Sequence, residues 1–467
     1  MRAVNPRTGE ADYQFREADA ADVAQTACQL RARQPEWESR GAAARADTLR
    51  AFAAAVERRA DAIAAALAVD TGRTAIARIE VETLGRTLTR WADRTPELLA
   101  PLPRDPAPSL TPGITIAPRW SAYPLFGAIA PWNFPVILSH IDAVPALAAG
   151  CAALVKPSEV TPRVVEPLRE ALAEVPDLPL AYVLGGAKTG QALVAEVDYI
   201  CFTGSTATGR KVAEAAGRRL IPANLELGGK DALIVTETAE LVAAAQVALR
   251  ASVVATGQAC QSIERIFVAR ELAEPFLAEL VRAAQEVKLA PEGGPLGPFI
   301  HLPQADKVQA QIDEAVACGA RVLTGGTVER IGGGAYLRPT VLTGVTPDMA
   351  VMREETFGPV LPVMTFADLD EAVQLANTGD YGLSAAVIAG SAEEAALIGE
   401  RLDAGAVSLQ DAGLTTYVSD ATNHSRRGSG LGPSRMGDEG LTRFLRRQAL
   451  MRQDGAPLPL QAYAETS

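Results

Sequence analysis

Residues 199–219, YICFTGSTATGRKVAEAAGRR, decide the class of fold. A short apolar run ends in a turn of Gly204, Ser205 and Thr206, and a helical pattern begins before Gly209. Glycines in such a turn allow the backbone to approach a phosphate, and the free N–H groups of a helix N-terminus favour negative charge. The turn is not GxGxxG, so it predicts either a dinucleotide site or an ordinary helix cap.

The same alternation of strand and helix extends along the chain on both sides of this turn. The apolar runs GAIAP, CAALVKP, AYVLGG and YICFTG are separated by helical segments, which is typical of parallel strands with crossover helices. A second series begins near Asp231, with DALIV, RIFVA and AVIAG as strands. Residues 20–99 predict amphipathic scaffold helices, and LTRFLRRQAL, residues 441–450, predicts a further helix. The pattern therefore predicts a two-domain α/β protein, in keeping with 467 residues.

Composition excludes several classes of function. A formal charge of -12 disfavours binding to nucleic acid or anionic lipid. No apolar run reaches the roughly 18–20 residues needed to cross a bilayer, and no apolar segment follows the basic N-terminus, so we expect a cytoplasmic protein without a membrane partner. Five scattered cysteines and three histidines argue against a disulfide framework or a metal site.

Three polar residues in loops are candidates for catalysis. Cys260 lies in GQACQS, a polar loop suited to a reactive thiol, although a lone loop cysteine is usually inert. Glu226 in NLELGGKD has apolar neighbours that favour a general base, although such a carboxylate is normally solvated. Asn133 in PWNFP is a rigidly held amide donor or a simple turn residue.

In VKPSE, Lys156 and Glu159 are either ribose ligands or surface charges.

Six segments in order, PWNFP, KPSE, FTGSTATG, ELGGKD, GQACQS and EETFGPV, span Pro131 to Val360. Together they resemble the aldehyde dehydrogenase superfamily, of the NAD(P)-dependent, hydrolytic type. The resemblance implies that Cys260 is the nucleophile and that Glu226 activates either the thiol or the deacylating water. It also implies an oxyanion hole made by Asn133 and the backbone N–H of Cys260.

The resemblance also implies a cofactor site. Lys156 and Glu159 would hold the adenosine ribose, the turn after Gly204 the pyrophosphate, and Glu355 with Phe357 the nicotinamide end. Because Glu159 would repel a 2′-phosphate, NAD is favoured and NADP stays possible. No metal is implied. The full set of implied cofactor residues is Trp132, Lys156, Pro157, Ser158, Glu159, Phe202, Thr203, Gly204, Ser205, Gly209, Leu227, Gly228, Glu355 and Phe357.

The resemblance implies an aldehyde dehydrogenase-like α/β fold in three parts. A Rossmann-type dinucleotide-binding domain would comprise residues 1–109 and 124–228, and a second α/β, catalytic domain residues 229–430. Residues 110–123 and 431–467 would form a small β bridging element, which implies a homodimer or homotetramer. Besides other copies of the chain, the implied partner is a small-molecule aldehyde substrate.

Two segments depart from the family pattern. Ser429 to Gly432 lead to Pro433 and Ser434 instead of Arg and Glu, so a proton relay must use other groups. Residues 419–430, SDATNHSRRGSG, lack the aromatic–glycine–glycine pattern. Arg426 and Arg427 in this segment could receive a carboxylated aldehyde, or could be solvated or at a subunit interface.

Two rival functions stay open. A CoA-acylating dehydrogenase would pass the acyl group to CoA, but it would not need the water-activating carboxylate of Glu226. A non-catalytic binding protein could keep the fold, since a fold does not fix function. The presence of both Cys260 and Glu226 argues against this second alternative.

Overall fold

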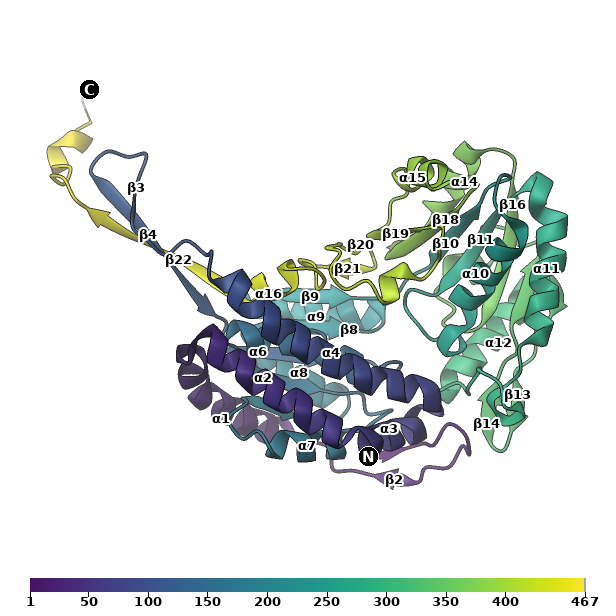
Figure 1. Ribbon diagram of the computed structural model, residues 1–467, viewed down its shortest axis with the longest axis horizontal. Coiled ribbons are helices and arrows are strands. Elements are labelled where there is room, and N and C mark those ends of the chain that lie inside the picture. The colour runs from purple at the N-terminus through teal and green to yellow at the C-terminus, as the bar shows by residue number, and fades with distance from the viewer. Residues whose placement is uncertain (466–467) are drawn as a thin grey trace.

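The computed structural model describes residues 1–465 and contains two parallel sheets covered by helices (Figure 1). The first sheet has the order β21(Gly430–Leu431), β9(Ala223–Glu226), β8(Tyr199–Thr203), β5(Leu125–Ile129), β6(Ala152–Lys156) and β7(Leu180–Tyr182). Its strands are parallel except for β21, which pairs antiparallel with β9. The predicted first series of strands is confirmed.

Helices cover both faces of this sheet because alternate strand residues point to opposite sides. Phe126, Val155 and Cys201 pack against one group of helices, and Leu125 and Ile200 pack against the other. The first group is α2(Gly41–Arg58), α3(Ala60–Thr71), α4(Thr74–Leu99), α6(Ala143–Ala149) and α7(Val165–Ala173). The second group is α1(Ala20–Ser39), α8(Ala187–Glu196) and α9(Thr206–Arg219).

The second sheet has seven strands and is also covered on both faces. Its order is β12(Arg321–Thr324), β15(Thr340–Thr343), β16(Val360–Phe366), β11(Ile263–Ala269), β10(Asp231–Val235), β18(Ser384–Ile388) and β19(Ala406–Leu409). One face packs on α12(Leu302–Ala317), α14(Leu369–Ala376) and α15(Ala392–Gly399), the other on α10(Leu241–Val253) and α11(Ala273–Glu286). Only β12 is antiparallel to its neighbour, so the second series is a parallel sheet as predicted.

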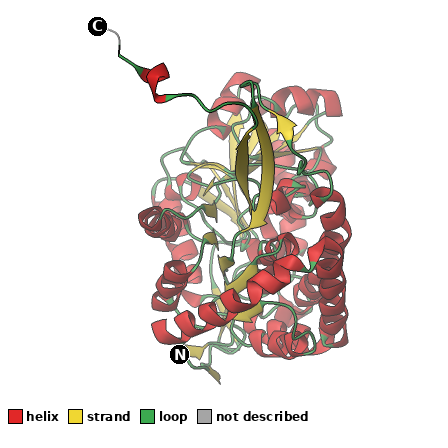
Figure 2. Ribbon diagram, turned by 90° about the vertical axis from the view of Figure 1, so that its left-hand side faces the viewer, coloured by secondary structure: helices red, strands yellow, loops and turns green. Residues whose placement is uncertain are grey.

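A three-stranded arm projects from the body (Figure 1). It consists of β22(Leu445–Gln453), β4(Ile114–Ala122) and β3(Ala107–Pro108). The segment after β22 extends away from the body (Figure 2). The arm is thus built from two parts of the chain that are more than 300 residues apart in sequence.

The predicted helix over residues 441–450 is wrong. A short helix, α16(Glu439–Thr442), is followed by strand β22, which pairs with β4 from Leu445↔Ala122 to Gln453↔Ile114. Long-range pairing overrides the local helical pattern, as is common for strands. Arg446 and Arg447 also stack over the rings of Tyr123 and Trp120.

Within residues 1–465, no helix is both long enough and apolar enough to cross a membrane.

Candidate active site

The predicted site residues gather where the strands of the first sheet end. Strand β9 ends at Glu226, β8 at Thr203 and β6 at Lys156. The carboxyl ends of neighbouring parallel strands share one edge of a sheet, which is where α/β proteins form their sites. Cys260 lies near this edge, since a Cβ on Gly229, three residues after Glu226, would lie 2.5 Å from the carbonyl oxygen of Cys260.

The loop before Cys260 has a strained backbone. Ala255, Thr256 and Gly257 have φ angles of 57°, 61° and 65°. A left-handed conformation costs a non-glycine residue about 1–3 kcal/mol and persists only where the surroundings enforce it. Here Thr256 Oγ1 donates to the carbonyl of Gly297 at 3.0 Å, and a Cβ on Gly257 would lie 2.3 Å from the carbonyl carbon of Gly358. The loop is therefore held tightly against the segment after Glu355.

Gln258 fixes the rest of this loop from inside the protein. Its side chain is fully buried, and its Nε2 donates to the carbonyls of Ala255 at 3.2 Å and Pro298 at 3.3 Å. Its Oε1 accepts from the N–H of Ile300 at 2.9 Å. Cys260 is thus presented by a rigid loop, and its own side chain is half-buried.

The surroundings of Cys260 disfavour the thiolate. Burial, followed by the carboxylates of Glu355, Asp231 and Glu226, raises the pKa of the Cys260 thiol to about 12, although Arg435 opposes this shift. The expected partial exposure is present, but the charges nearest the thiol are mainly negative. Reaction at neutral pH therefore requires a group that removes the thiol proton or a positive charge close to the sulfur.

We predict that alkylation of Cys260 by iodoacetamide accelerates steadily with pH. Below a thiol's pKa its thiolate fraction rises about tenfold per pH unit, so the rate should climb without a plateau from about pH 7 to pH 10. Peptide mapping by mass spectrometry gives the rate for each cysteine, and exposed Cys28 provides the internal comparison. A plateau for Cys260 near neutral pH would contradict this description of its surroundings.

Asn133 is a buried amide aimed at the cysteine loop. Its Nδ2 donates to the carbonyl oxygen of Gln258 at 3.0 Å, which leaves its second N–H hydrogen for another acceptor. The side chain is 2% exposed. The guanidinium of Arg73 donates to the backbone carbonyl of Asn133. The geometry therefore suits a fixed donor beside Cys260.

Two buried charges that the sequence reasoning missed support the PWNFP segment. Arg73 precedes α4, and burial lowers its pKa to about 10. Glu80, on the same helix, accepts from the N–H groups of Val136 at 3.0 Å and Ile137 at 3.2 Å, and burial raises its pKa to about 7. In a sequence rich in surface arginine and glutamate, nothing local distinguishes these two residues.

Glu226 is held from two sides at the end of β9. Strand β21 pairs Gly430 with Glu226, and the Ser425 hydroxyl donates to Glu226 Oε2 at 2.7 Å. The backbone carbonyl of Glu226 accepts from the N–H of Gly204 at 3.1 Å. The carboxylate is therefore a hydrogen-bonded acceptor between the turn after β8 and the 419–430 segment.

The segment with Glu355 and Phe357 depends on a buried ion pair. Glu264 accepts from the N–H groups of Thr356 at 2.8 Å and Phe357 at 2.7 Å. Lys230 Nζ donates to Glu264 Oε2 and to Thr356 Oγ1, both at 2.8 Å. The sequence reasoning also missed Glu264, although a lone acid inside the buried strand β11 is a signal for such a role.

Glu355 and Phe357 point back to the other predicted site residues. Burial, followed by the nearby Glu264, raises the pKa of Glu355 to about 7. A Cβ on Gly228 would lie 2.9 Å from Cδ of Glu355, so only glycine allows this approach. The Phe357 ring meets Trp132 edge to face, with 5.4 Å between centroids. The structure thus brings these four residues together.

We predict that Glu264→Ala destabilises the fold by about 3–5 kcal/mol, the usual cost of removing one partner of a buried ion pair. The change removes the carboxylate partner of Lys230 and leaves two backbone N–H groups without their acceptor. Urea unfolding followed by circular dichroism measures the loss, with exposed Glu237→Ala as the control. A loss below about 1 kcal/mol would show that water or rearrangement replaces these bonds.

The glycine turn after β8 fits a phosphate. Ser205 caps α9, where its Oγ accepts from the N–H of Thr208 at 3.4 Å. A Cβ on Gly209 would lie 2.4 Å from the side chain of Leu227, so this glycine allows the helix to start close to the strand ends. Free N–H groups and the positive end of the 14-residue helix face the same edge as Glu226.

Lys156 and Glu159 lie at the end of β6, on the same edge. Lys156 Nζ donates to Glu159 Oε2 at 3.1 Å, and Glu159 keeps a side-chain exposure of 38%. Ser158 Oγ accepts from the N–H of Val160 at 3.2 Å, which fixes the turn that begins at Pro157. A carboxylate in this position suits the hydroxyl groups of a ribose.

The description "Aldehyde dehydrogenase family" belongs to the family model that matches residues 1–450. The chain belongs to this family. It is therefore an NAD(P)-dependent aldehyde dehydrogenase, which oxidises aldehydes to acids.

Known proteins resemble this aldehyde dehydrogenase over nearly its whole length. "Putative succinate-semialdehyde dehydrogenase", of NADP(+) type, from Mycolicibacterium smegmatis is 37% identical over 441 residues, 92% of this chain and 84% of that relative. The solved "Putative Aldehyde Dehydrogenase PutA" from Anabaena variabilis is 45% identical, with a TM-score of 0.95 over 98% of this chain and 99% of that one. A betaine aldehyde dehydrogenase from Staphylococcus aureus, solved with NAD+, is 27% identical, with a TM-score of 0.91 over 100% and 93% of the two chains.

The two departures from the family pattern have structural roles in this aldehyde dehydrogenase. Ser434 is buried, and its Oγ accepts from the N–H groups of Asn423 and Met436, both at 3.1 Å. The next residue, Arg435, is also buried and donates to Asp142 at 2.6 Å and to Thr203 Oγ1 at 2.8 Å. The sequence reasoning missed Arg435, which is the cation near Glu226.

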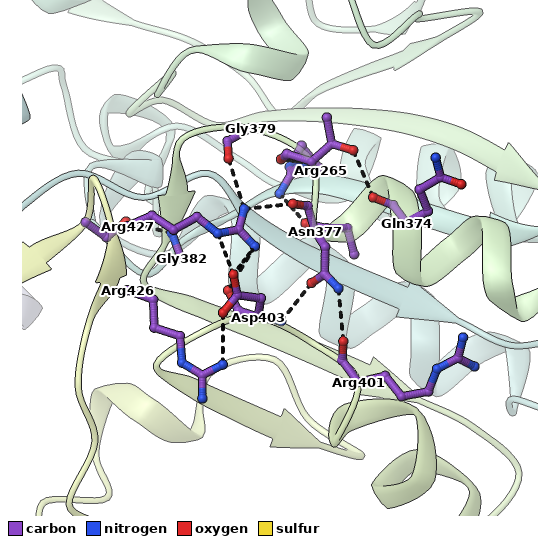
Figure 3. Close-up of polar contacts among 12 residues, drawn as sticks. Arg265, Gln374, Asn377, Gly379, Gly382, Arg401, Asp403, Arg426 and Arg427 are labelled. Carbon is purple, nitrogen blue, oxygen red and sulfur yellow. Dashed lines mark hydrogen bonds and ion pairs between the residues drawn. The ribbon is translucent and has the colours of Figure 1, made fainter.

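Arg426 and Arg427 already have a carboxylate partner. Arg426 Nη1 donates to Asp403 at 3.0 Å, and Arg427 Nε donates to the other oxygen of Asp403 at 2.6 Å (Figure 3). These bonds lower the pKa of Asp403. The two guanidinium groups thus fasten the 419–430 segment to the second sheet's loops, which argues against a role as the receptor of a carboxylated substrate.

Proposed function

We propose that the enzyme oxidises a small aldehyde by covalent catalysis at Cys260, with water as the final acyl acceptor. Two observations carry this proposal. The buried Asn133 amide binds the backbone two residues before Cys260, and the carboxylate of Glu226 lies near the thiol. A nucleophile, an oxyanion donor and a base therefore share one edge of the first sheet.

In the first half-reaction, Cys260 Sγ forms a bond to the aldehyde carbon after losing its proton. Asn133 Nδ2 and the backbone N–H of Cys260 stabilise the alkoxide that develops on the aldehyde oxygen. A bound nicotinamide cofactor would supply the acceptor for the hydride that leaves this carbon. Cys260 then carries the acyl group as a thioester.

In the second half-reaction, Glu226 removes a proton from water as the water oxygen attacks the thioester carbon. The carbon–sulfur bond breaks, the carboxylic acid leaves and the thiolate of Cys260 is regenerated. Retention of Glu226 favours this hydrolytic route over transfer to CoA, because a thiol acceptor does not need a water-activating carboxylate.

For the cofactor we propose NAD in preference to NADP. Glu159 accepts the hydroxyl groups of the ribose and repels a 2′-phosphate, whereas Lys156 is already paired with Glu159. Glu355 and Phe357, whose ring contacts Trp132, would hold the nicotinamide end, and Phe202 and Thr203 precede the phosphate turn. Because the relative from Mycolicibacterium smegmatis is named for NADP(+), the preference for NAD needs a direct comparison of the two cofactors.

The defining experiment mixes the purified protein with NAD or NADP and each of a panel of aldehydes. The absorbance of reduced nicotinamide gives the rate. The panel contains aliphatic, aromatic and carboxylated aldehydes, with succinate semialdehyde among the last. We expect higher efficiency with NAD, a carboxylic acid as the product and no gain from added CoA. An acyl-CoA product would contradict the hydrolytic route.

We predict that Asn133→Ala lowers kcat/KM about 10²–10³-fold, the usual cost of one lost oxyanion donor. The thiol remains in place, so alkylation of Cys260 should stay within about threefold of wild type. Steady-state kinetics and alkylation rates separate the two effects. An unchanged kcat/KM would remove Asn133 from the mechanism.

The three-part division of the chain is also a proposal. Residues 1–109 and 124–228 would bind the dinucleotide, and residues 229–430 would carry the nucleophile. The bridging element, 110–123 and 431–467, includes residues 466 and 467, which lie outside the described residues. The cytoplasmic location stays a prediction.

We propose that the arm joins two copies of the chain in a homodimer or homotetramer. Strand β22 lies at the edge of the arm's sheet, so one side of its backbone is open to pair with another strand. Leu450 and Met451 on this strand are 50% and 73% exposed. Analytical ultracentrifugation of wild type and of a Leu450→Lys, Met451→Lys variant tests this proposal. We expect the variant to dissociate, and an oligomer of unchanged size would contradict the proposal.

A further inference from the structure

We propose that Ser425 is a positioning residue that holds the carboxylate of Glu226 for attack by water on the acyl-enzyme. The proposal rests on the role assigned above to Glu226. The Ser425 hydroxyl donates to Glu226 Oε2 at 2.7 Å, a distance typical of a strong bond to a carboxylate. One carboxylate oxygen is thus occupied, and the other accepts no hydrogen bond within residues 1–465, which leaves it available for a proton.

Contacts of Arg426 and Arg427 anchor the 419–430 segment to the loops of the second sheet, next to Ser425. Arg426 and Arg427 form the short strand β20 against β17(Tyr381–Gly382), and both guanidinium groups bind Asp403 (Figure 3). Arg427 Nη1 also donates to the carbonyl of Gly379 at 2.9 Å. Loops of the second sheet therefore fix the backbone immediately after Ser425.

The other side of the segment is fastened to the first sheet. Ser429 is buried; its Oγ accepts from the N–H of Gly382 at 2.9 Å, and its carbonyl accepts from the N–H of Leu227 at 2.9 Å. Strand β21 then pairs Gly430 with Glu226. Ser425 also lies against Gly430, because a Cβ on Gly430 would be 2.5 Å from the Ser425 Cβ.

These contacts give Ser425 a fixed place beside Glu226. A Glu side chain has three rotatable bonds, and a general base must be within hydrogen-bond reach of the proton that it removes. Without the hydroxyl, Glu226 keeps its charge but loses the contact that fixes one of its oxygens. A bond to a charged group is worth enough to change a rate about tenfold when it acts on the transition state.

The test uses 4-nitrophenyl acetate as the probe, because this ester acylates a nucleophilic thiol without cofactor and without knowledge of the natural aldehyde. Cys260 Sγ attacks the ester carbonyl, 4-nitrophenolate leaves, and water later converts the acetyl-thioester to acetate and free thiol. The burst of nitrophenolate reports acylation. Intact-protein mass spectrometry after removal of the ester reports the lifetime of the acetyl-enzyme.

We expect Ser425→Ala to lengthen this lifetime about tenfold while the rate of the burst stays within about twofold of wild type. Ser419→Ala removes a hydroxyl from the same segment that makes no contact with Glu226 in residues 1–465, and should leave both rates unchanged. A lifetime unchanged by Ser425→Ala would overturn the proposal. So would an equal fall in both rates, because that result indicates a general structural role.

Glu226→Gln separates this inference from the function on which it rests. If Glu226→Gln lengthens the lifetime and Ser425→Ala does not, only the positioning role fails. If Glu226→Gln leaves the lifetime unchanged, the base assignment fails, and the role of Ser425 fails with it.

Discussion

Replacement of Cys260 by alanine should abolish aldehyde oxidation, with a fall in kcat of about 10⁴-fold or more, as is usual when a covalent nucleophile is removed. The half-buried thiol makes no hydrogen bond within the described residues, so the fold should tolerate the change. The measurement is the rate of nicotinamide reduction with the best aldehyde of the panel. Nucleotide binding, measured by calorimetry, should persist.

Cys318→Ala is the matched control, because Cys318 is exposed and lies at the end of α12. Its activity should equal that of wild type. If Cys260→Ala kept more than about a tenth of the wild-type rate, the reaction would not proceed through a thioester on this residue. Loss of nucleotide binding in the same variant would point to misfolding instead.

The positions of Glu226 and of the cofactor candidates on the first sheet could be predicted because each lies in a local pattern at a strand end, whereas Cys260 lies in a polar loop before β11. The turn after β8, the end of β9 and the end of β6 are visible as apolar runs followed by glycine or charge. Parallel strands then place these ends on one edge. Glu226 and Lys156 therefore lie on the same edge of the sheet once the strands are parallel, and the alternation of strands and helices predicts parallel strands.

The supports of the site could not be predicted in the same way. Arg73, Glu80 and Glu264 bind backbone partners 56 to 92 residues away in the sequence, and their contribution depends on burial, which a local pattern does not give. Strand β22 is a similar case, since β4 lies more than 300 residues before it. Such residues resemble ordinary surface charges until the tertiary contacts are known.

The electrostatics around Cys260, the proposed nucleophile, also differ from what a reactive cysteine suggests. The sequence predicts a partly exposed thiol in a polar loop, and the structure adds three carboxylates that raise the pKa of Cys260. A high pKa protects a resting thiol from oxidation and alkylation, since only the thiolate reacts. Reactivity then depends on the assembled site, in which Arg435 is a cation that lowers the pKa of the thiol.

Glu226→Gln should slow turnover about 10²–10⁴-fold, the range that general bases contribute. The change keeps the size of the side chain, and the amide oxygen still accepts from the Ser425 hydroxyl, so the local structure should persist. The amide cannot remove a proton from water. The acyl-enzyme should therefore accumulate after one rapid turnover, as a burst of reduced nicotinamide followed by a slow steady state.

The size and rate of that burst distinguish two roles for Glu226. One equivalent of reduced nicotinamide per subunit, formed at close to the wild-type rate, would mean that Glu226 acts only on the deacylating water. A burst slowed as much as turnover would mean that Glu226 removes the thiol proton, since a thiol with a pKa of about 12 needs a proton acceptor to attack at neutral pH. Glu240→Gln, which changes only an exposed helix cap, controls for the loss of charge.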